Sequence, residues 1–351
     1  MGNTFVTIKR TALIFGITAQ DGILLAEDLL RLGVHVVGCG RSPSIENCRG
    51  LDPLRHKLVL EKVSLTHQDA IDTLIKKHRP DEIYNFAAQS LPVLSWNDGM
   101  ETGEITALGA HRIFESVRKL KAGCRIYQAS SSEMYGGGGA DGLNEESPFR
   151  PLNPYAAAKC YAHHVARLYR DSYGLYIACG ILFNHESRYR GMRFLTQKIA
   201  YGVACAHSGI RNSDLLNEEG EPIVKNGKLS LGNLDAARDW GYAGDYVRAI
   251  HMIMQLPKAE DFVIGTGTLR TVRDLCAAAY GCAGLNWRDH VVSDPRFVRP
   301  LETRALFADA SKAKRILGWT AKTPIEDVLA DMVGVHLANL QAGESQRAAA
   351  M

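Results

Sequence analysis

Short apolar runs and amphipathic stretches alternate along the first half of the chain. Where the helical spacing is clearest, Leu24, Leu25 and Leu29 lead up to Gly33, a helix stop signal. Six runs have the length of buried strands: residues 12–15, 34–39, 58–60, 82–86, 124–129 and 175–183. Strands that alternate with helices imply a parallel sheet covered by helices on both faces. The pattern therefore predicts an α/β fold with a doubly wound, Rossmann-type parallel sheet.

The alternation becomes looser after about residue 186, and the second half carries different local signals. Residues 212–227 are polar and rich in turn formers, which predicts an exposed loop or hairpin. Two Thr-x-x-acid patterns, which begin at Thr271 and Thr323, predict helix starts with capping boxes, and Pro324 strengthens the second. We therefore expect a smaller α/β substrate-binding domain in this half.

The two expected domains are interleaved along the chain. We expect the Rossmann-type domain to span residues 8–185, with return segments near 232–265 and 304–319. The substrate-binding domain is then assembled from residues 186–231, 266–303 and 320–345. Ligands of such folds bind at the carboxyl ends of the parallel strands.

Composition narrows the possible functions. A chain of 351 residues that is 46% hydrophobic is long enough for one large domain or two closely joined ones. The formal net charge of +3 is too mild to indicate nucleic acid or a membrane surface. The eight cysteines contain no Cys-x-x-Cys pair, so we expect no metal site and a reducing compartment. No apolar run approaches the ~20 residues of a membrane span, so we expect a soluble, cytoplasmic protein.

Tyr155 and Lys159 are the strongest chemical signal. A tyrosine four residues before a lysine places both side chains on one face of a helix. The ammonium can then stabilise a tyrosinate and lower the phenol pKa from its usual value of ~10. A phenol with a lowered pKa can act as a general base near neutral pH.

The upstream cluster Ser130-Ser131-Ser132-Glu133 adds hydroxyl groups and a second base. A serine hydroxyl can hold a substrate oxygen, and the Glu133 carboxylate can accept a proton. One base is sufficient to oxidise an alcohol. A second, carboxylate base indicates that a carbon acid is deprotonated as well.

A glycine-containing turn, Gly16-x-x-Ala19-x-x-Gly22, follows the first predicted strand and opens the first predicted helix. Glycines there allow a tight turn and a close approach of the backbone to a pyrophosphate at a helix N-terminus. The middle position is Ala19, so the motif by itself is a weak signal. Its place at the head of an alternating chain favours a dinucleotide cofactor over an ordinary strand–helix turn.

The residues after the second predicted strand favour NADP over NAD. An acidic residue at this point would bond the ribose hydroxyls of NAD. This chain has Arg41-Ser42 instead, and a guanidinium can meet a 2′-phosphate through charge-assisted hydrogen bonds. A solvated surface arginine is the alternative interpretation.

Longer stretches carry a family resemblance. The spacing from the glycine turn through the hydroxyl cluster to Tyr155-x-x-x-Lys159 resembles the extended short-chain dehydrogenase/reductase family. Several segments are similar to GDP-mannose 4,6-dehydratase: residues 85–90, 130–136, 184–187, 190–191, 231–241 and 299–302. The resemblance runs from about residue 11 to about residue 340, and the segment that ends at Trp240-Gly241 is hard to explain by chance.

The resemblance implies a lyase, a hydro-lyase of nucleotide-sugar metabolism, that converts GDP-mannose to GDP-4-keto-6-deoxymannose. Tyr155 would take the proton of the C4 hydroxyl, while Lys159 lowers its pKa and holds the nicotinamide ribose. Ser131 would hydrogen-bond the C4 oxygen, where the family usually has threonine. Glu133 would abstract the C5 proton and help water to leave from C6, before hydride returns to C6. Ser132 matches the GDP-mannose pattern, since dehydratases of dTDP-glucose usually have an Asp-Glu pair.

The resemblance also implies the residues of two binding sites. Those expected at NADP are Gly16, Thr18, Ala19, Gln20, Asp21, Gly22, Arg41, Ser42, Ser64, Leu65, Ala87, Ala88, Tyr155, Lys159 and His185. Those expected at the GDP-sugar are Ser90, Glu133, Asn184, Arg190, Lys198, Arg238, Arg299 and Glu302. We interpret His185 as a histidine locked by hydrogen bonds behind the site, with a catalytic role as the alternative.

Several positions depart from the family pattern. Ala19 replaces a glycine, and Ser64 stands where an aspartate near the adenine is usual. Leu91, Pro92 and Tyr189 depart from it at positions expected near the sugar. A GDP-heptose 4,6-dehydratase and a GDP-sugar 4-dehydrogenase or epimerase therefore remain alternatives. A non-catalytic NADP(H)-binding regulator is the alternative from another class. The family usually forms homodimers or homotetramers, so a homo-oligomer is expected.

Overall fold

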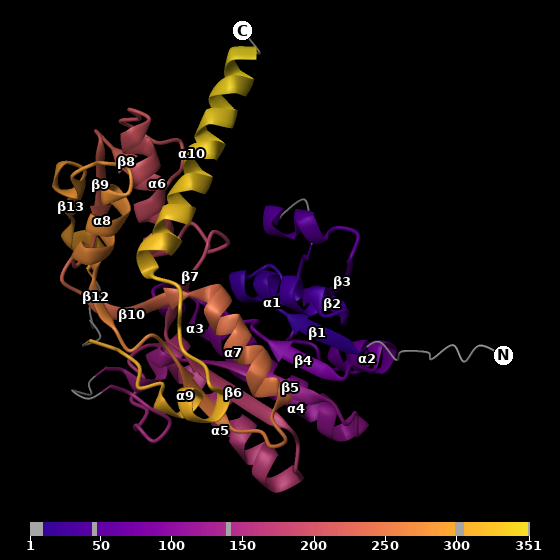
Figure 1. Ribbon diagram of the computed structural model, residues 1–351. Coiled ribbons are helices and arrows are strands. Elements are labelled where there is room, and N and C mark those ends of the chain that lie inside the picture. Colours follow the sequence, from indigo (N-terminus) through magenta and orange to yellow (C-terminus); the bar gives the residue numbers. More distant parts are fainter. Residues whose placement is uncertain (1–9, 44–47, 138–141, 299–304, 350–351) are drawn as a thin grey trace.

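The computed structural model describes residues 10–43, 48–137, 142–298 and 305–349 (Figure 1). Its centre is a sheet of seven parallel strands in the order β11-β6-β5-β4-β1-β2-β3. The strands are β1 (Thr11–Phe15), β2 (His35–Gly40), β3 (Leu58–Lys62), β4 (Glu82–Asn85), β5 (Arg125–Ser131), β6 (Ile177–Leu182) and β11 (Asp261–Ile264). The predicted doubly wound α/β fold is confirmed.

The six predicted strands coincide with β1 to β6, with ends that differ by at most two residues. The seventh strand, β11, was not predicted. It is only four residues long and lies in the half of the chain where the alternation becomes irregular. β11 joins the sheet by pairing with β6. Its strand conformation therefore depends on hydrogen bonds to a neighbour, which its own short sequence pattern does not indicate.

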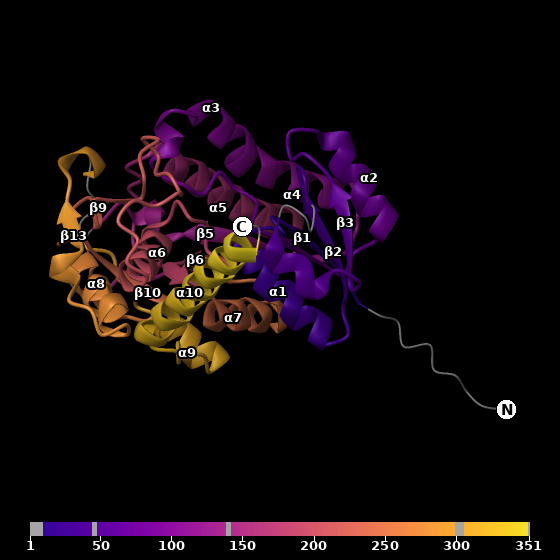
Figure 2. The same cartoon turned by 90° about the horizontal axis from the view of Figure 1, so that it is seen from above.

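Helices cover both faces of the central sheet (Figure 2). In β1, Ala12 and Ile14 face one helix layer, whereas Leu13 and Phe15 face the other, so a strand buried on both faces reads as a continuous apolar run. One layer contains α1 (Gln20–Arg31), α7 (Ala243–Gln255) and α9 (Ser311–Leu317). The other contains α2 (Gln68–His78), α4 (Gly109–Leu120) and α5 (Pro154–Tyr173).

A second group of elements, here called the small lobe, has its own hydrophobic core. It contains α6 (Leu195–His207), α8 (Val272–Gly281), α10 (Ile325–Ala349) and a sheet of β8 (Val224–Lys225), β9 (Lys228–Leu231) and β13 (Val291–Ser293). A further sheet joins this lobe to the central sheet: β7 (Asn184–Glu186), which directly follows β6, pairs with β10 (Ala237–Tyr242), and β10 pairs with β12 (Leu269–Thr271).

Two local signals of the second half are confirmed. The stretch 212–227 ends in a β8–β9 hairpin, whose turn residues Asn226 and Gly227 have φ of 54° and 77°. Positive φ at both positions is the requirement of the tight hairpin turn that Asn-Gly satisfies best. At the start of α8, Thr271 and Asp274 form the reciprocal hydrogen bonds of a capping box.

Helix α10 begins against the core of the small lobe and extends well beyond it (Figure 1). Its first turns bury Val328, Leu329 and Met332 in that core. Despite its length, neither α10 nor any other helix in the described part of the chain combines the length and apolarity that crossing a bilayer requires.

Asp245, in the first turn of α7, determines where α10 begins. Its fully buried carboxylate accepts the backbone N–H groups of Lys322 and Thr323, each at 2.8 Å, and pairs with Arg248. The Asp245 carbonyl accepts the indole N–H of Trp319 at 2.9 Å. Because residues 322–323 lead directly into α10, one carboxylate connects the sheet-covering layer to the small lobe.

We predict that Asp245→Ala lowers the free energy of unfolding by about 2–4 kcal/mol, because it leaves buried N–H donors without an acceptor. Urea denaturation measures this change. The control is Asp235→Ala, which removes the exposed ion pair with Arg273 and should leave the stability nearly unchanged. An equal loss in both variants would contradict the assigned role of Asp245.

Candidate active site

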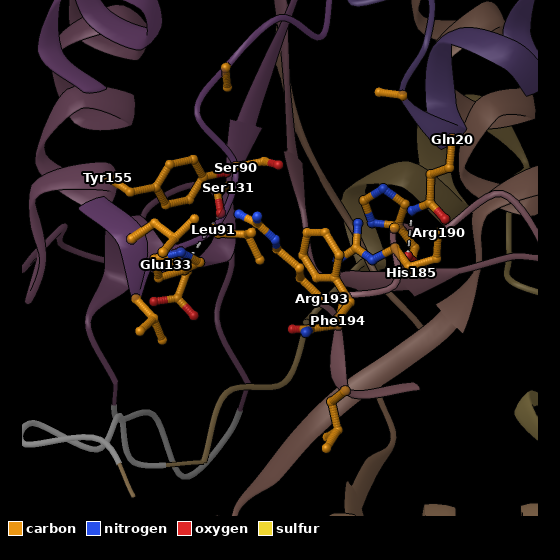
Figure 3. A pocket seen from close by; sticks show the side chains of 18 of the residues that line it. Gln20, Ser90, Leu91, Ser131, Glu133, Tyr155, His185, Arg190, Arg193 and Phe194 are labelled. Atoms are coloured by element: carbon orange, nitrogen blue, oxygen red, sulfur yellow. Dashed lines mark hydrogen bonds between the residues drawn. The ribbon is translucent and has the colours of Figure 1, made fainter. Parts of the chain in front are cut away.

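A cleft of about 1020 Å³ opens at the carboxyl ends of the parallel strands and extends into the small lobe (Figure 3). Its walls include the ends of β1, β2, β5 and β6 on one side and the starts of α6 and β10 on the other. Among the described residues, all those predicted at the site line this cleft except Gly22 and Ser42. Arg299 and Glu302 lie outside the described residues.

At two positions of the turn after β1 a side chain would collide with neighbouring backbone atoms. Gly16 has φ of +85°, and a Cβ on it would lie 2.9 Å from the Ala87 nitrogen. A Cβ on Gly22 would lie 2.4 Å from the Gly16 oxygen. Ala19 has φ of −80° and an exposed side chain, so the middle position does not need glycine. The open turn at the N-terminus of α1 therefore fits a pyrophosphate.

His185 is locked beneath this turn. Its Nδ1 lies 2.6 Å from the Phe183 carbonyl oxygen, and its Nε2 lies 3.0 Å from the Asp21 carboxylate. Both partners can accept hydrogen bonds, so this arrangement favours the doubly protonated ring. Burial acts to lower the pKa of His185, but Asp21 outweighs it and the net pKa is raised. Burial and His185 act in opposite senses on Asp21, whose net pKa is lowered. This geometry supports the structural interpretation of His185.

The Gln20 side chain lies behind the turn. Its Nε2 donates to the His185 carbonyl at 2.6 Å, and its Oε1 accepts from the Ser187 hydroxyl at 2.9 Å. Gln20 is only 4% exposed. Its side chain therefore holds the segment after β7 in place, and only its backbone is available to a cofactor.

Ser131, Tyr155 and Lys159 converge at the end of β5. Ser131 is the last residue of β5, and its hydroxyl lies beside the Tyr155 phenol (Figure 3). Lys159 lies one turn further along α5, with its Nζ 5.8 Å from the centre of the Tyr155 ring. The same ammonium donates to the Ala129 carbonyl at 2.7 Å. The predicted serine–tyrosine–lysine arrangement is thus present in one place.

The expected lowering of the phenol pKa is outweighed by burial in this geometry. Burial raises the pKa of Tyr155 to about 12, and the opposing effect of the Ser131 hydrogen bond is smaller. Burial also lowers the pKa of Lys159 to about 8. The free-energy cost of removing a charged side chain from water exceeds the stabilisation that the neighbouring groups provide. The phenol therefore stays protonated near neutral pH.

Glu133 is connected to the same helix by Asn153. The Asn153 Nδ2 donates to the Glu133 carboxylate at 3.1 Å, while its Oδ1 accepts the Ala156 N–H at 2.8 Å as the N-cap of α5. The Glu133 N–H donates to the Ser131 hydroxyl at 3.2 Å. Sequence reasoning missed Asn153, although Asn followed by Pro at a helix start is a recognisable cap signal. Ser132 is 3% exposed and also lines the cleft.

The basic side chains expected at the substrate differ in the contacts that already restrain them. Arg190 stacks on Phe194, with 3.6 Å from guanidinium to ring centre, and its Nε lies 3.2 Å from the buried Glu186 carboxylate. Arg238 on β10 is 7% exposed and donates to the Ala237 carbonyl. Both line the cleft, as does Asn184. The fixed side chain of Arg190 places its charge at the middle of the cleft.

The positive charge of Lys198 is neutralised by a carboxylate of the same chain. Its Nζ lies 2.7 and 2.6 Å from the two carboxylate oxygens of Glu218. Glu218 belongs to the turn 217–220, where the Asn217 side chain accepts backbone N–H groups from residues 219 and 221. The stretch predicted as an exposed hairpin therefore also contributes a carboxylate to the cleft wall, which the sequence pattern did not indicate.

The residues expected at the adenosine end are mostly engaged locally. The Arg41 Nη1 donates to Glu101 at 2.7 Å, and both side chains are more than half exposed. The Ser64 hydroxyl lies 2.7 Å from that of Thr66. Ser42 is exposed and lies outside the cleft lining. Only weak contacts would have to change for Arg41 to meet a phosphate.

Leu91 and Tyr189 lie in different parts of the cleft. Leu91 lies beside Ser131 and Glu133 (Figure 3). Tyr189 lies toward α1, where its hydroxyl donates to Glu27 at 3.0 Å. The Tyr189 ring packs with the core beneath α1, on the side of the cofactor turn. Ala87, Ala88 and Ser90 line the cleft after β4.

Comparison with known proteins agrees with this site. The family model for GDP-mannose 4,6 dehydratase matches residues 13–332. GDP-mannose 4,6 dehydratase 1 of Arabidopsis thaliana is 40% identical, over 94% of this chain and 90% of its own length. GDP-mannose 4,6-dehydratase of Vibrio cholerae is 36% identical, over 93% of each chain. A crystal structure of a putative epimerase from Burkholderia cenocepacia superposes with a TM-score of 0.78 at 25% identity, covering 94% of this chain and 98% of its own. The chain therefore belongs to the GDP-mannose 4,6 dehydratase family.

Proposed function

We propose that the protein is an NADP-dependent hydro-lyase that converts GDP-mannose to GDP-4-keto-6-deoxymannose. The observation that carries this proposal is that Asn153 connects the two bases: it caps the helix of Tyr155 and hydrogen-bonds Glu133. An alcohol oxidation needs the tyrosine alone, whereas a dehydration also needs a base for a carbon acid. The names of the relatives support GDP-mannose as the substrate.

The cofactor would lie along the turn Gly16–Gly22, with its nicotinamide ribose at Tyr155 and Lys159. When bound, NADP accepts a hydride from C4 of the sugar, returns it to C6, and brings a positive charge that favours the phenolate. The glycine turn supports a dinucleotide, because a Cβ at Gly16 would collide with the backbone after β4. Arg41 supports NADP, since it can exchange the exposed Glu101 contact for a 2′-phosphate.

Tyr155 and Ser131 act on the C4 oxygen. The Ser131 hydroxyl, which lies beside the phenol, holds the substrate oxygen next to Tyr155. Tyr155 takes the O4 proton as the alcohol becomes a ketone, and Lys159 stabilises the phenolate. The serine supplies the same hydroxyl as the threonine that is usual in this family.

Glu133 acts on C5 and C6. The C4 ketone acidifies the C5 proton, which the carboxylate accepts, and the same proton can then leave with the C6 hydroxyl as water. Asn153 keeps one carboxylate oxygen hydrogen-bonded, so the carboxylate is oriented before the substrate arrives. When hydride returns to C6, C5 takes up a proton, which balances the proton that Tyr155 removed from O4. Overall one water is lost and no redox equivalent is consumed.

We also propose how the chain is organised around this reaction. Residues 8–185, with the return segments near 232–265 and 304–319, bind NADP, and the remaining segments bind the GDP-sugar. A cytoplasmic homodimer or homotetramer would use the outer face of α5, which exposes Tyr161, Leu168 and Tyr173. The free thiols of the described cysteines support a reducing compartment.

We predict that Glu133→Gln stops the reaction after the first oxidation. The amide cannot accept the C5 proton, so kcat should fall by about a hundredfold to ten-thousandfold. Reduced cofactor should accumulate on the enzyme, which its absorbance measures, while mass spectrometry follows the loss of water. Glu146→Gln, on an exposed glutamate, is the matched control. Normal dehydration by the Glu133 variant would remove the carbon-acid base from the proposal, and a wild type that dehydrates no GDP-hexose or GDP-heptose would remove the class.

A second prediction concerns pH. Lys159 has a pKa of about 8 and loses its charge as the pH rises through that value. If its ammonium supports the phenolate, kcat/KM of the wild type should fall above about pH 8. Lys159→Arg keeps a positive charge there, so its rate should be lower but without the same decline. An identical decline in this variant would show that a different group titrates.

A third prediction separates NADP from NAD. Arg41→Ala should raise the Kd for NADPH by about tenfold to a hundredfold, because a charge-assisted contact with the 2′-phosphate is lost. The Kd for NADH should stay the same. Arg31→Ala, at the far end of α1, is the control, since Arg31 pairs with Asp28 away from the cleft. Fluorescence titration of the reduced cofactors gives both values, and equal affinities for the two cofactors in the wild type would refute NADP specificity.

A further inference from the structure

The cations that line the cleft are almost all engaged with groups of the chain. In the described residues they are Arg41, Lys159, Arg190, Arg193, Lys198, Arg238 and Arg296. Arg41, Arg190, Lys198 and Arg296 have carboxylate partners. Lys159 and Arg238 donate to backbone carbonyls. Arg193 alone has neither a hydrogen bond nor an ion pair to any described residue.

Arg193 extends from the segment between β7 and α6 toward the catalytic end of the cleft (Figure 3). Its guanidinium points toward Leu91 and Ser131. Arg190 in the same segment points the other way and stacks on Phe194. The two arginines therefore present their charges to different parts of a bound substrate.

The carboxylates nearest to these elements do not neutralise Arg193. Glu133 accepts from Asn153, Glu186 pairs with Arg190, and Glu218 pairs with Lys198. An unpaired guanidinium in a cleft raises the local positive potential and attracts an anion. Its planar fork of donors matches two oxygens of one phosphate.

We propose that Arg193 binds the β-phosphate of the GDP-sugar, the phosphate that carries the sugar. This inference rests on the proposed function, because it requires a sugar at Ser131, Glu133 and Tyr155. The β-phosphate is joined to C1 of that sugar, so it must lie next to the catalytic end, where the Arg193 guanidinium points. The contact fixes the sugar relative to both bases, so Arg193 is a substrate-binding residue that also controls specificity for diphosphates. No prediction from the sequence included it.

The test is a binding measurement that needs no turnover. Isothermal titration gives the Kd of GDP and of GMP for the wild type, Arg193→Ala, Arg193→Lys and Arg188→Ala. Arg193→Ala should raise the Kd for GDP by about tenfold to a hundredfold. GMP lacks the β-phosphate, so its Kd should stay within about twofold of the wild-type value. Arg193→Lys should lose less affinity for GDP, because lysine keeps the positive charge but lacks the planar pair of guanidinium donors.

Arg188→Ala is the matched control. It removes an arginine from the same segment, but this one pairs with Asp331 of α10 and lies outside the cleft lining. Both of its affinities should equal those of the wild type. Arg193 is exposed, so thermal melting should show that its variants remain folded.

Three results would overturn the inference. An unchanged Kd for GDP in Arg193→Ala would show that the side chain does not contact the diphosphate. An equal loss for GDP and GMP would place its contact on the nucleoside or the first phosphate. Failure of the wild type to bind GDP at all would refute the proposed function itself, and the wild-type titration distinguishes that case from the first two.

Discussion

The attachment of α5 to the end of β5 is the constraint on which the rest of the site depends. Two polar contacts make it specific: the Lys159 ammonium on the Ala129 carbonyl, and the Asn153 side chain between the cap of α5 and Glu133. The parallel register of β5 against β6 then sets Ser131 opposite Leu182, just before β7 turns toward the small lobe. A shift of the helix by one turn would separate the phenol from the hydroxyl and the carboxylate together.

Burial at this junction has a chemical consequence. The same desolvation that holds α5 against the sheet raises the pKa of Tyr155 to about 12 and lowers that of Lys159 to about 8. The raised pKa disfavours the phenolate form of Tyr155, and the lowered pKa disfavours the charged form of Lys159. A further positive charge beside the phenol would offset this cost of burial, and the oxidised nicotinamide of the proposed cofactor would supply one.

The sequence predicted the parts of this structure that depend on short-range pattern. Alternation located six strands, and a Tyr-x-x-x-Lys pattern with its upstream serine and glutamate located side chains that line one cleft at the end of β5. It missed what depends on packing partners far along the chain. It did not indicate the hydrogen bond of Tyr189 to Glu27 or the ion pair of Lys198 with Glu218. The dominant effect of burial on the Tyr155 pKa was not indicated either, because helical spacing shows that two side chains are close but not how much solvent they lose.

Those distant partners also change how the charge of the cleft should be understood. A diphosphate gains only the difference between its new contacts and the contacts that it replaces. The exposed Arg41–Glu101 pair is weak and easily exchanged, whereas the Arg190–Glu186 pair is largely buried and should persist. Counting the basic residues in the matching motifs therefore overestimates the attraction for substrate. Recognition of the diphosphate depends on the few cations whose existing contacts are weak. A carboxylate such as Glu218 lowers the affinity of the cleft for every anion. Selection among anions then depends on the shape of the pocket.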